Sequence, residues 1–163
     1  MLLPSRSTRS RSSRPTDQDS PLTARYSRAT MIIAAALLEQ VVAHARLEAP
    51  NECCGLLALD EGRAAAVYEL ENLAASPLRF EVDGAKLAPL LFEIEEAGRE
   101  AAIYHSHTRS EPYPSQTDVN FARWWPGCEW LIIGLENDGE PIARSFMIGE
   151  GGVIEELVVE IDG

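Results

Sequence analysis

Two histidines separated by one residue are the side chains in this sequence with the clearest potential for chemistry. They open the polar, proline-containing stretch HSHTRSEPYPSQTD, residues 105–118. Side chains alternate across a strand, so a strand ending here points His105 and His107 to one face and Ser106 to the other. Zinc binds imidazole nitrogens and carboxylate oxygens, and a catalytic zinc site leaves one position open to water. The two histidines therefore form a candidate metal site, which Asp118 completes if the loop folds back.

The residues after this loop also fit the start of a helix. Ser115 and Asp118 match the capping-box pattern, with a serine at the N-cap and an acidic residue three positions later. This pattern explains both residues without a metal, just as a polar sheet face explains a His-x-His pair. The two interpretations are compatible, because a cap fixes where the helix starts. It would hold Asp118 close to the strand end that carries the histidines.

A hydrolytic zinc site also needs a base that takes the proton from the attacking water, and Glu52 is the candidate. Glu52 begins the apolar run ECCGLLAL, residues 52–59. Removing a carboxylate from water is costly, so an unpaired glutamate is rare at the end of a buried strand. The alternative is that residues 50–52 simply form an exposed loop.

Hydrophobic periodicity predicts the elements that must position these groups. Residues 31–34 form a strand, and the apolar residues that follow recur on one face of a helix that Pro50 ends. His44 lies on the opposite, polar face of that helix, where we expect exposure to solvent. A second helix spans residues 85–98, and a third starts at Ser115. Short apolar or alternating runs predict further strands at residues 52–59, 64–70, 79–83, 101–107, 130–135, 141–148 and 153–161.

The order of these elements predicts an α+β domain. Strands and helices are mixed, and the last three strands follow one another as hairpin partners, which argues against a doubly wound parallel sheet. We therefore expect a mixed, largely antiparallel sheet with helices packed on it. The length of 163 residues suits a single domain.

Charge is divided unevenly between the first 30 residues and the rest of the chain. Residues 1–30 contain six arginines and two aspartates, whereas the remainder has 8 basic and 24 acidic residues. The Arg/Ser-rich segment has few large apolar residues, so we expect a disordered extension before a domain over residues 31–163. Its composition also fits a transit peptide, an RNA-binding tail, or an extension upstream of a true start at Met31. The acidic domain argues against nucleic acid as a partner.

The three cysteines lack the spacing of a secreted disulfide framework, which favours a reducing, cytoplasmic location. No signal peptide or run of about 18 apolar residues is visible, so we expect no membrane association. A thiol peptidase using Cys53 or Cys54 would need a histidine beside the thiol to form a reactive thiolate. Because both lie in an apolar run, packing in the core is the expected role.

Taken together, Glu52 and the pattern H-S-H-x7-S-x2-D from His105 to Asp118 resemble the JAMM motif of the MPN+ (Mov34/PAD-like) zinc metallopeptidases. All five polar positions of the motif are present without substitution. The flanking stretches NECCGLLAL and YHSHTRSEPYPSQTDVNFA resemble the short bacterial branch that acts on ubiquitin-like sulfur-carrier proteins. That branch includes the peptidase that frees cysteine from such a carrier. The resemblance covers residues 31–163.

This resemblance implies a three-layer MPN fold of the cytidine-deaminase-like kind and one zinc ion per chain. His105, His107 and Asp118 would ligate the zinc. Glu52 would activate the zinc-bound water, and Ser115 would donate a hydrogen bond to the oxyanion. The substrate would be a ubiquitin-like or sulfur-carrier protein whose Gly-Gly tail is joined to cysteine, a lysine or a peptide. The alternative is an inactive MPN-type scaffold that binds such a partner, and the sequence leaves the oligomeric state open.

Overall fold

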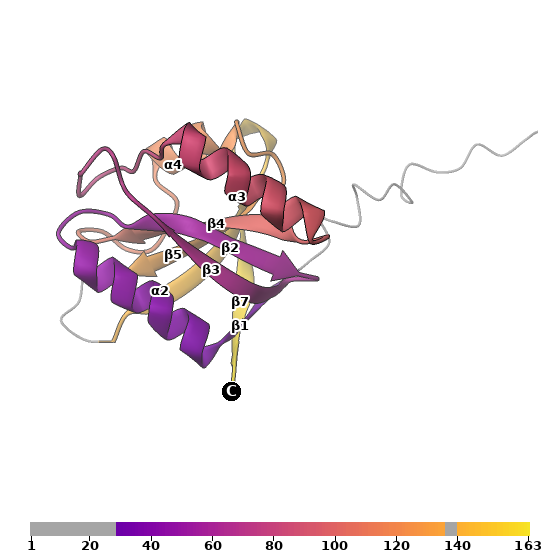
Figure 1. Cartoon of the computed structure of the whole chain (residues 1–163). Helices are drawn as coiled ribbons and strands as arrows, with labels where there is room; N and C mark the ends of the chain where they lie inside the picture. Colours follow the sequence, from indigo (N-terminus) through magenta and orange to yellow (C-terminus); the bar gives the residue numbers. More distant parts are fainter. Residues whose placement is uncertain (1–28, 136–139) are drawn as a thin grey trace, which may run out of the picture.

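Seven strands of one sheet form the centre of the protein, and helices lie on both sides of it (Figure 1). The computed structural model describes residues 29–135 and 140–163. In chain order the elements are β1 Thr30–Ala34, α2 Ala35–Glu48, β2 Cys54–Asp60, β3 Arg63–Leu70, α3 Gly84–Glu96, β4 Glu100–His107, α4 Gln116–Ala122, β5 Glu129–Gly134, β6 Ile142–Ile148, the short 3-10 helix η2 Glu150–Gly152, and β7 Ile154–Asp162.

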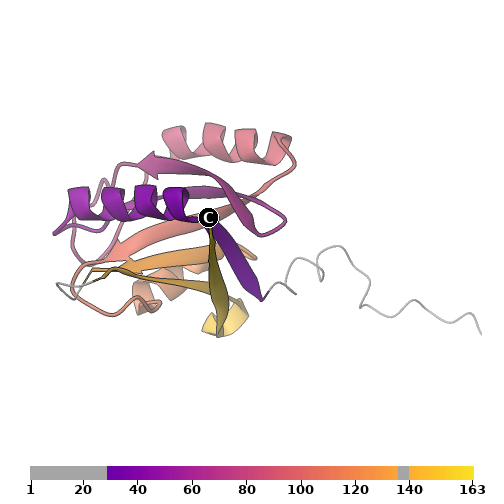
Figure 2. The same cartoon turned by 90° about the horizontal axis from the view of Figure 1, so that it is seen from below.

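The sheet closes on itself, because β1 pairs with both β3 and β7 and completes the order β1-β3-β2-β4-β5-β6-β7. The pairs β1/β3, β1/β7 and β4/β5 are parallel, and the other four are antiparallel. Figure 2 shows β1 and β7 running side by side. The mixed, largely antiparallel sheet is therefore confirmed, as are the consecutive hairpin partners β5, β6 and β7. Its closure by β1 goes beyond what the periodicity predicted.

Alternate side chains of the strands pack into two hydrophobic clusters, one on each face of the sheet. In the first cluster, Leu57 and Tyr104 pack with Val41 of α2. In the second, Leu56 of the sheet belongs to the same cluster as Ile94 of α3 and Ala122 of α4. β2 is buried on both faces along almost its whole length. The helices and the sheet therefore form three layers, as expected for the α+β class.

The segment between β3 and α3 is a loop, so the strand predicted for residues 79–83 is wrong. The alternation of polar and apolar residues is nevertheless meaningful, since Phe80 packs against the second cluster. The backbone N–H of Glu81 donates to the side chain of Asn72 at 3.0 Å, and the carbonyl of Glu81 accepts from the N–H of Leu73 at 2.8 Å. These bonds use the backbone groups that pairing with a neighbouring strand would need.

The prediction that His44 is exposed to solvent is also wrong. His44 is buried under α2, and its Nδ1 lies 2.8 Å from the hydroxyl of Tyr104 in β4. Buried polar groups need a hydrogen-bond partner, and Tyr104 brings one beneath the helix. The apolar face of α2 is as predicted, with Val41, Val42 and Ala45 buried.

Most of the predicted disordered extension, residues 1–28, lies outside the described residues, so the domain boundary stays a prediction. β1 begins at Thr30, one residue before the expected start of the domain. Among the helices of the described part, none combines the length and the apolar character needed to cross a membrane.

Gly55 of β2 is a position where a larger residue should destabilise the sheet. A Cβ atom there would lie 2.4 Å from the ring of Tyr104 and 2.4 Å from the carbonyl oxygen of Tyr68. Because this backbone carbonyl cannot swing away, we expect Gly55→Ala to lower the free energy of unfolding by about 1–3 kcal/mol, measured by denaturant titration. Gly84→Ala is the matched control, since nothing lies within 4 Å of its Cβ position. Equal unfolding midpoints for Gly55→Ala and wild type would contradict this packing.

Candidate metal centre and active site

The side chains of His105, His107 and Asp118 meet in the interior of the protein. The two Nε2 atoms of the histidines lie 3.1 Å apart. The carboxylate oxygens of Asp118 lie 3.1 Å from Nε2 of His105 and 3.3 Å from Nε2 of His107. All three residues are buried, and one possible ligand atom from each lies within 4.8 Å of the others. Two imidazole nitrogens and a carboxylate at this separation fit the donor set that zinc accepts.

The loop that follows β4 sets the orientation of His107. Nδ1 of His107 lies 2.8 Å from the backbone carbonyl oxygen of Glu111, which can only accept. In the neutral ring the hydrogen is therefore on Nδ1, and Nε2 presents its lone pair to the centre. Pro112 of the same loop packs against Gly134 of β5, where a Cβ atom would come within 2.7 Å of the proline ring. Residue types could not predict this role of Glu111, because its backbone and not its side chain supplies the acceptor.

Aromatic rings hold His105 instead. The ring centre of Phe80 lies 5.0 Å from that of His105, and Trp130 meets the imidazole edge-on at 5.9 Å. Within the described residues, Nδ1 of His105 has no hydrogen-bond partner. Only Nε2 is left to compensate for the loss of water around this ring. That atom faces the other two candidate ligands.

The predicted capping box at the start of α4 is present and fixes Asp118. Oγ of Ser115 accepts from the backbone N–H of Asp118 at 3.2 Å, and Oδ2 of Asp118 accepts from the backbone N–H of Ser115 at 2.7 Å. The hydroxyl of Ser115 also donates to Oδ2 of Asp118 at 2.8 Å. The candidate metal ligand Asp118 is therefore the second residue of the capping box, and three hydrogen bonds hold it to the N-cap residue Ser115.

Glu52 is only 4% exposed, which rules out the exposed-loop alternative for this residue. Its backbone N–H donates to the carbonyl of Ser76 at 2.9 Å, and its carbonyl accepts from Nδ2 of Asn72 at 2.9 Å. Burial raises the pKa of the Glu52 carboxyl, against the lowering effect of His105 and His107. The charges of His105, His107 and Asp118 therefore all act on the Glu52 carboxyl, and its role as the base stays a prediction.

The surroundings of the site shift the pKa values of two candidate ligands, His107 and Asp118, in opposite directions. Burial acts to lower the pKa of His107, but the bonds to the Asp118 carboxylate and the Glu111 carbonyl outweigh it, so the pKa is raised. Burial acts to raise the pKa of Asp118, but the charge of His105 and the bonds from both histidines and Ser115 hold it far below its usual range. Asp118 is therefore ionised at neutral pH, as a carboxylate metal ligand must be.

The cysteines do not offer a competing nucleophile. All three are free and buried, and burial raises the pKa of the Cys53, Cys54 and Cys128 thiols to about 12. The reactive form of cysteine is the thiolate, which these residues do not reach near neutral pH. The packing role predicted for Cys53 and Cys54 is confirmed, and their buried thiols do not favour a thiol peptidase.

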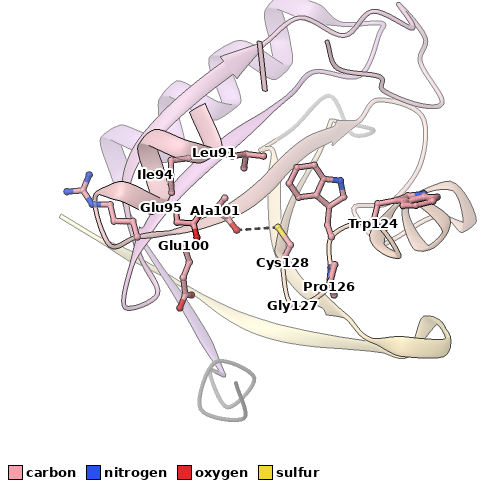
Figure 3. Close-up of a pocket in the computed structure, with 11 residues that line it drawn as sticks. Leu91, Ile94, Glu95, Glu100, Ala101, Trp124, Pro126, Gly127 and Cys128 are labelled. Carbon is pink, nitrogen blue, oxygen red and sulfur yellow. Dashed lines mark hydrogen bonds between the residues drawn. The ribbon is translucent and has the colours of Figure 1, made fainter. Parts of the chain in front are cut away.

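The protein also has a pocket of about 370 Å³, which Figure 3 shows with its lining residues and which includes none of the candidate ligands. It is formed by the end of α3, the start of β4 and the segment after α4. Ala101, which lines the pocket, lies near the start of β4, whereas the candidate ligand His107 is its last residue. Trp124 stands at the pocket and is 81% exposed, whereas Trp130 is fully buried in the second cluster. The pocket is therefore separate from the chemistry described above.

Several known proteins are similar to this chain in sequence and in structure. Residues 34–149 match the family described as prokaryotic homologues of the JAB domain. The CysO-cysteine peptidase of Mycobacterium tuberculosis (strain H37Rv) is 35% identical over 131 residues, which cover 78% of this chain and 89% of that protein. The desampylase of Haloferax volcanii is 36% identical over 138 residues, which cover 80% of this chain and 95% of that protein.

The solved structure of protein DSY2949 from Desulfitobacterium hafniense is also similar, with 30% identity and a TM-score of 0.70. The similarity covers 81% of this chain and 92% of that one. The matched family region contains every residue of the candidate site, and the three-layer α+β arrangement is the MPN fold that the motif implied. This chain therefore belongs to the prokaryotic JAB-domain family, the JAMM/MPN+ peptidases.

Proposed function

We propose that this protein is a zinc-dependent hydrolase that cleaves the peptide or isopeptide bond after the C-terminal Gly-Gly of a ubiquitin-like or sulfur-carrier protein. The observation that carries the proposal is the convergence of His105, His107 and Asp118, whose charges also act on the buried carboxyl of Glu52. Two similar proteins, named as a CysO-cysteine peptidase and a desampylase, support this class of substrate.

His105, His107 and Asp118 would hold the zinc ion and leave a fourth position open. Zinc bound there would lower the pKa of a water molecule and polarise the scissile carbonyl. The carboxylate of Glu52 would accept the proton of the attacking water and pass it to the leaving amine. A group that first accepts and then gives a proton works best with a pKa near the working pH, and burial moves the pKa of Glu52 in that direction.

Ser115 would donate its hydroxyl hydrogen to the oxyanion that forms on the scissile carbonyl. A hydroxyl has a single hydrogen, and that of Ser115 is given to Oδ2 of Asp118. This oxygen also accepts from the backbone N–H of Ser115 at 2.7 Å, so it keeps a donor when the hydroxyl turns toward the oxyanion. One such donor contributes about 3–4 kcal/mol to acyl transfer in comparable sites. The helix cap and the oxyanion role are therefore compatible.

The low exposure of the site residues favours a substrate end without side chains. Glu52, His105, His107 and Asp118 are each at most 4% exposed. A bulky side chain next to the scissile bond would not reach these groups, whereas glycine has no side chain beyond hydrogen. We therefore propose an extended Gly-Gly tail as the part of the substrate that enters, joined to cysteine, a lysine or a peptide.

Asp118→Asn tests the metal site. We expect wild type to bind one zinc ion per chain and the variant to lose more than about 100-fold in zinc affinity, because the neutral amide is a poor ligand. Ser115 still caps α4 in this variant, and the amide oxygen at position 118 can still accept from the backbone N–H of Ser115, so the fold should persist. The matched control is Asp83→Asn at the cap of α3, which should bind zinc as wild type does. Metal analysis after dialysis and competition with a chelator give both quantities, and full zinc content in Asp118→Asn would rule out this ligand set.

Glu52→Gln tests the base. The amide has the size of the carboxylate but cannot carry the proton, so we expect kcat to fall about 10²- to 10⁴-fold with zinc content unchanged. The assay follows, by mass spectrometry, a Gly-Gly carrier protein joined in turn to cysteine, to a peptide and to a lysine. Glu39→Gln, an exposed glutamate of α2, should remain fully active.

Each result of this assay has a clear consequence. A fully active Glu52→Gln variant would refute the assignment of the base. A zinc-loaded wild type that cleaves none of the three conjugates would favour the scaffold alternative.

The raised pKa of His107 predicts how zinc affinity depends on pH. Zinc binding must displace the proton of this ring, so affinity should fall from about pH 8 to about pH 6, by about tenfold per pH unit once His107 is protonated. The metal-free protein should show the opposite trend in stability. The contribution of the raised pKa is present below the ordinary histidine pKa and is lost as the pH rises through the folded value.

Chelator competition and unfolding of the metal-free protein, each across this pH range, check both trends. His107→Ala should remove the part of the pH dependence of stability that this ring contributes. Zinc affinity that is constant across the range would contradict the placement of His107 at the metal.

A further inference from the structure

We propose that Asn72 is a positioning residue, which fixes the candidate base Glu52 relative to the candidate metal centre. This inference rests on the proposed function, because Asn72 would act only through Glu52. Asn72 lies two residues after the end of β3, is buried, and is 20 positions away from Glu52 in the chain. No local sequence pattern connects the two residues.

The side chain of Asn72 uses all of its hydrogen-bonding capacity. Nδ2 donates to the carbonyl oxygens of Glu52 at 2.9 Å and of Arg79 at 3.0 Å. Oδ1 accepts from the backbone N–H groups of Ala74 and Glu81, each at 3.0 Å. A primary amide has two N–H donors and one oxygen with two lone pairs, so this set is complete. Asn72 therefore closes the loop between β3 and α3 on itself and ties it to Glu52.

Glu52 needs this support because it lies outside the regular sheet. Strand pairing of β2 begins at Cys54, so the peptide groups of Glu52 take no part in the β2 ladders. Its N–H donates instead to the carbonyl of Ser76, and its carbonyl accepts from Asn72. Both partners belong to the same loop. The loop therefore helps to fix the backbone position of Glu52, and the side-chain bonds of Asn72 help to fix the conformation of the loop.

The same loop also touches a candidate metal ligand. Phe80 lies between Arg79 and Glu81, the two residues at this end of the loop whose backbone groups Asn72 binds. The ring centre of Phe80 lies 5.0 Å from that of His105. The loop thus reaches from the base at one end to a ligand at the other. Asn72 is the side chain that joins these two contacts.

Asn72→Asp removes the bonds that Nδ2 donates to Glu52 and Arg79 and keeps the bonds that Oδ1 accepts within the loop. The carboxylate can still accept from Ala74 and Glu81, but it cannot donate to the carbonyls of Glu52 and Arg79. An acceptor would then face an acceptor at Glu52, and the repulsion should move the base. Displacing a catalytic group by about 1 Å can reduce a rate by about 10²-fold.

We expect Asn72→Asp to lower kcat about 10- to 10²-fold, with KM and zinc affinity within about twofold of wild type. The same change in a Glu52→Gln background should cause almost no further loss of the residual rate, because no base is left to position. A purely structural role would lower activity by similar factors in both backgrounds. Asn120→Asp changes an exposed amide of α4 and serves as the matched control, with wild-type activity expected.

Amide hydrogen exchange gives a second readout that is independent of catalysis. In Asn72→Asp the N–H of Glu52 should exchange faster, whereas those of Ala74 and Glu81 should stay protected. The inference is overturned if the variant keeps wild-type kcat, if it loses as much activity in the Glu52→Gln background as alone, or if exchange at Glu52 is unchanged. A zinc-loaded wild type that cleaves no conjugate overturns the proposed function, and the catalytic role of Asn72 falls with it.

Discussion

The loss of water around four ionisable side chains is the constraint on which the rest of the site depends. Glu52, His105, His107 and Asp118 are almost completely buried. Charged groups are stable in such surroundings only when opposite charges or hydrogen bonds replace the water. Asp118 is well compensated by two imidazoles and the start of α4, and its pKa is accordingly low. For Glu52, burial outweighs the opposing charges of His105 and His107, so the pKa of its carboxyl is raised.

β4 supplies the rigid part of this arrangement. It lies between β2 and β5, so the histidines project from a strand that is paired on both sides. The residues between and before them face the other way and bind polar partners there. Tyr104 bonds His44 of α2, and Oγ of Ser106 accepts from the backbone N–H of Cys53 at 2.8 Å. One strand thus carries the candidate ligands on one face and anchors α2 and the chain beside Glu52 on the other.

Local patterns in the sequence predicted the parts of the site whose geometry is local. Strand alternation placed His105 and His107 on one face, and the spacing of Ser115 and Asp118 predicted the cap. Contacts between distant segments could not be predicted in this way, as the side-chain bonds of Asn72 and the closure of the sheet by β1 and β7 show. The alternation in residues 79–83 was misleading for the same reason. Phe80 does pack inward, but the side chain of Asn72 and one backbone bond from Leu73 hold the backbone there, without a paired strand.

The candidate ligands and the candidate base are supported by different kinds of structure. His105 and His107 belong to an internal strand, and Asp118 belongs to a capped helix, so strand pairing and the cap determine their positions. Glu52 precedes its strand, and its backbone bonds go to the loop between β3 and α3, where Asn72 makes four side-chain hydrogen bonds. The sheet and the cap would therefore determine whether a metal ion binds. The loop would determine whether a base stands beside it, which makes metal affinity and catalytic rate separable properties of this fold.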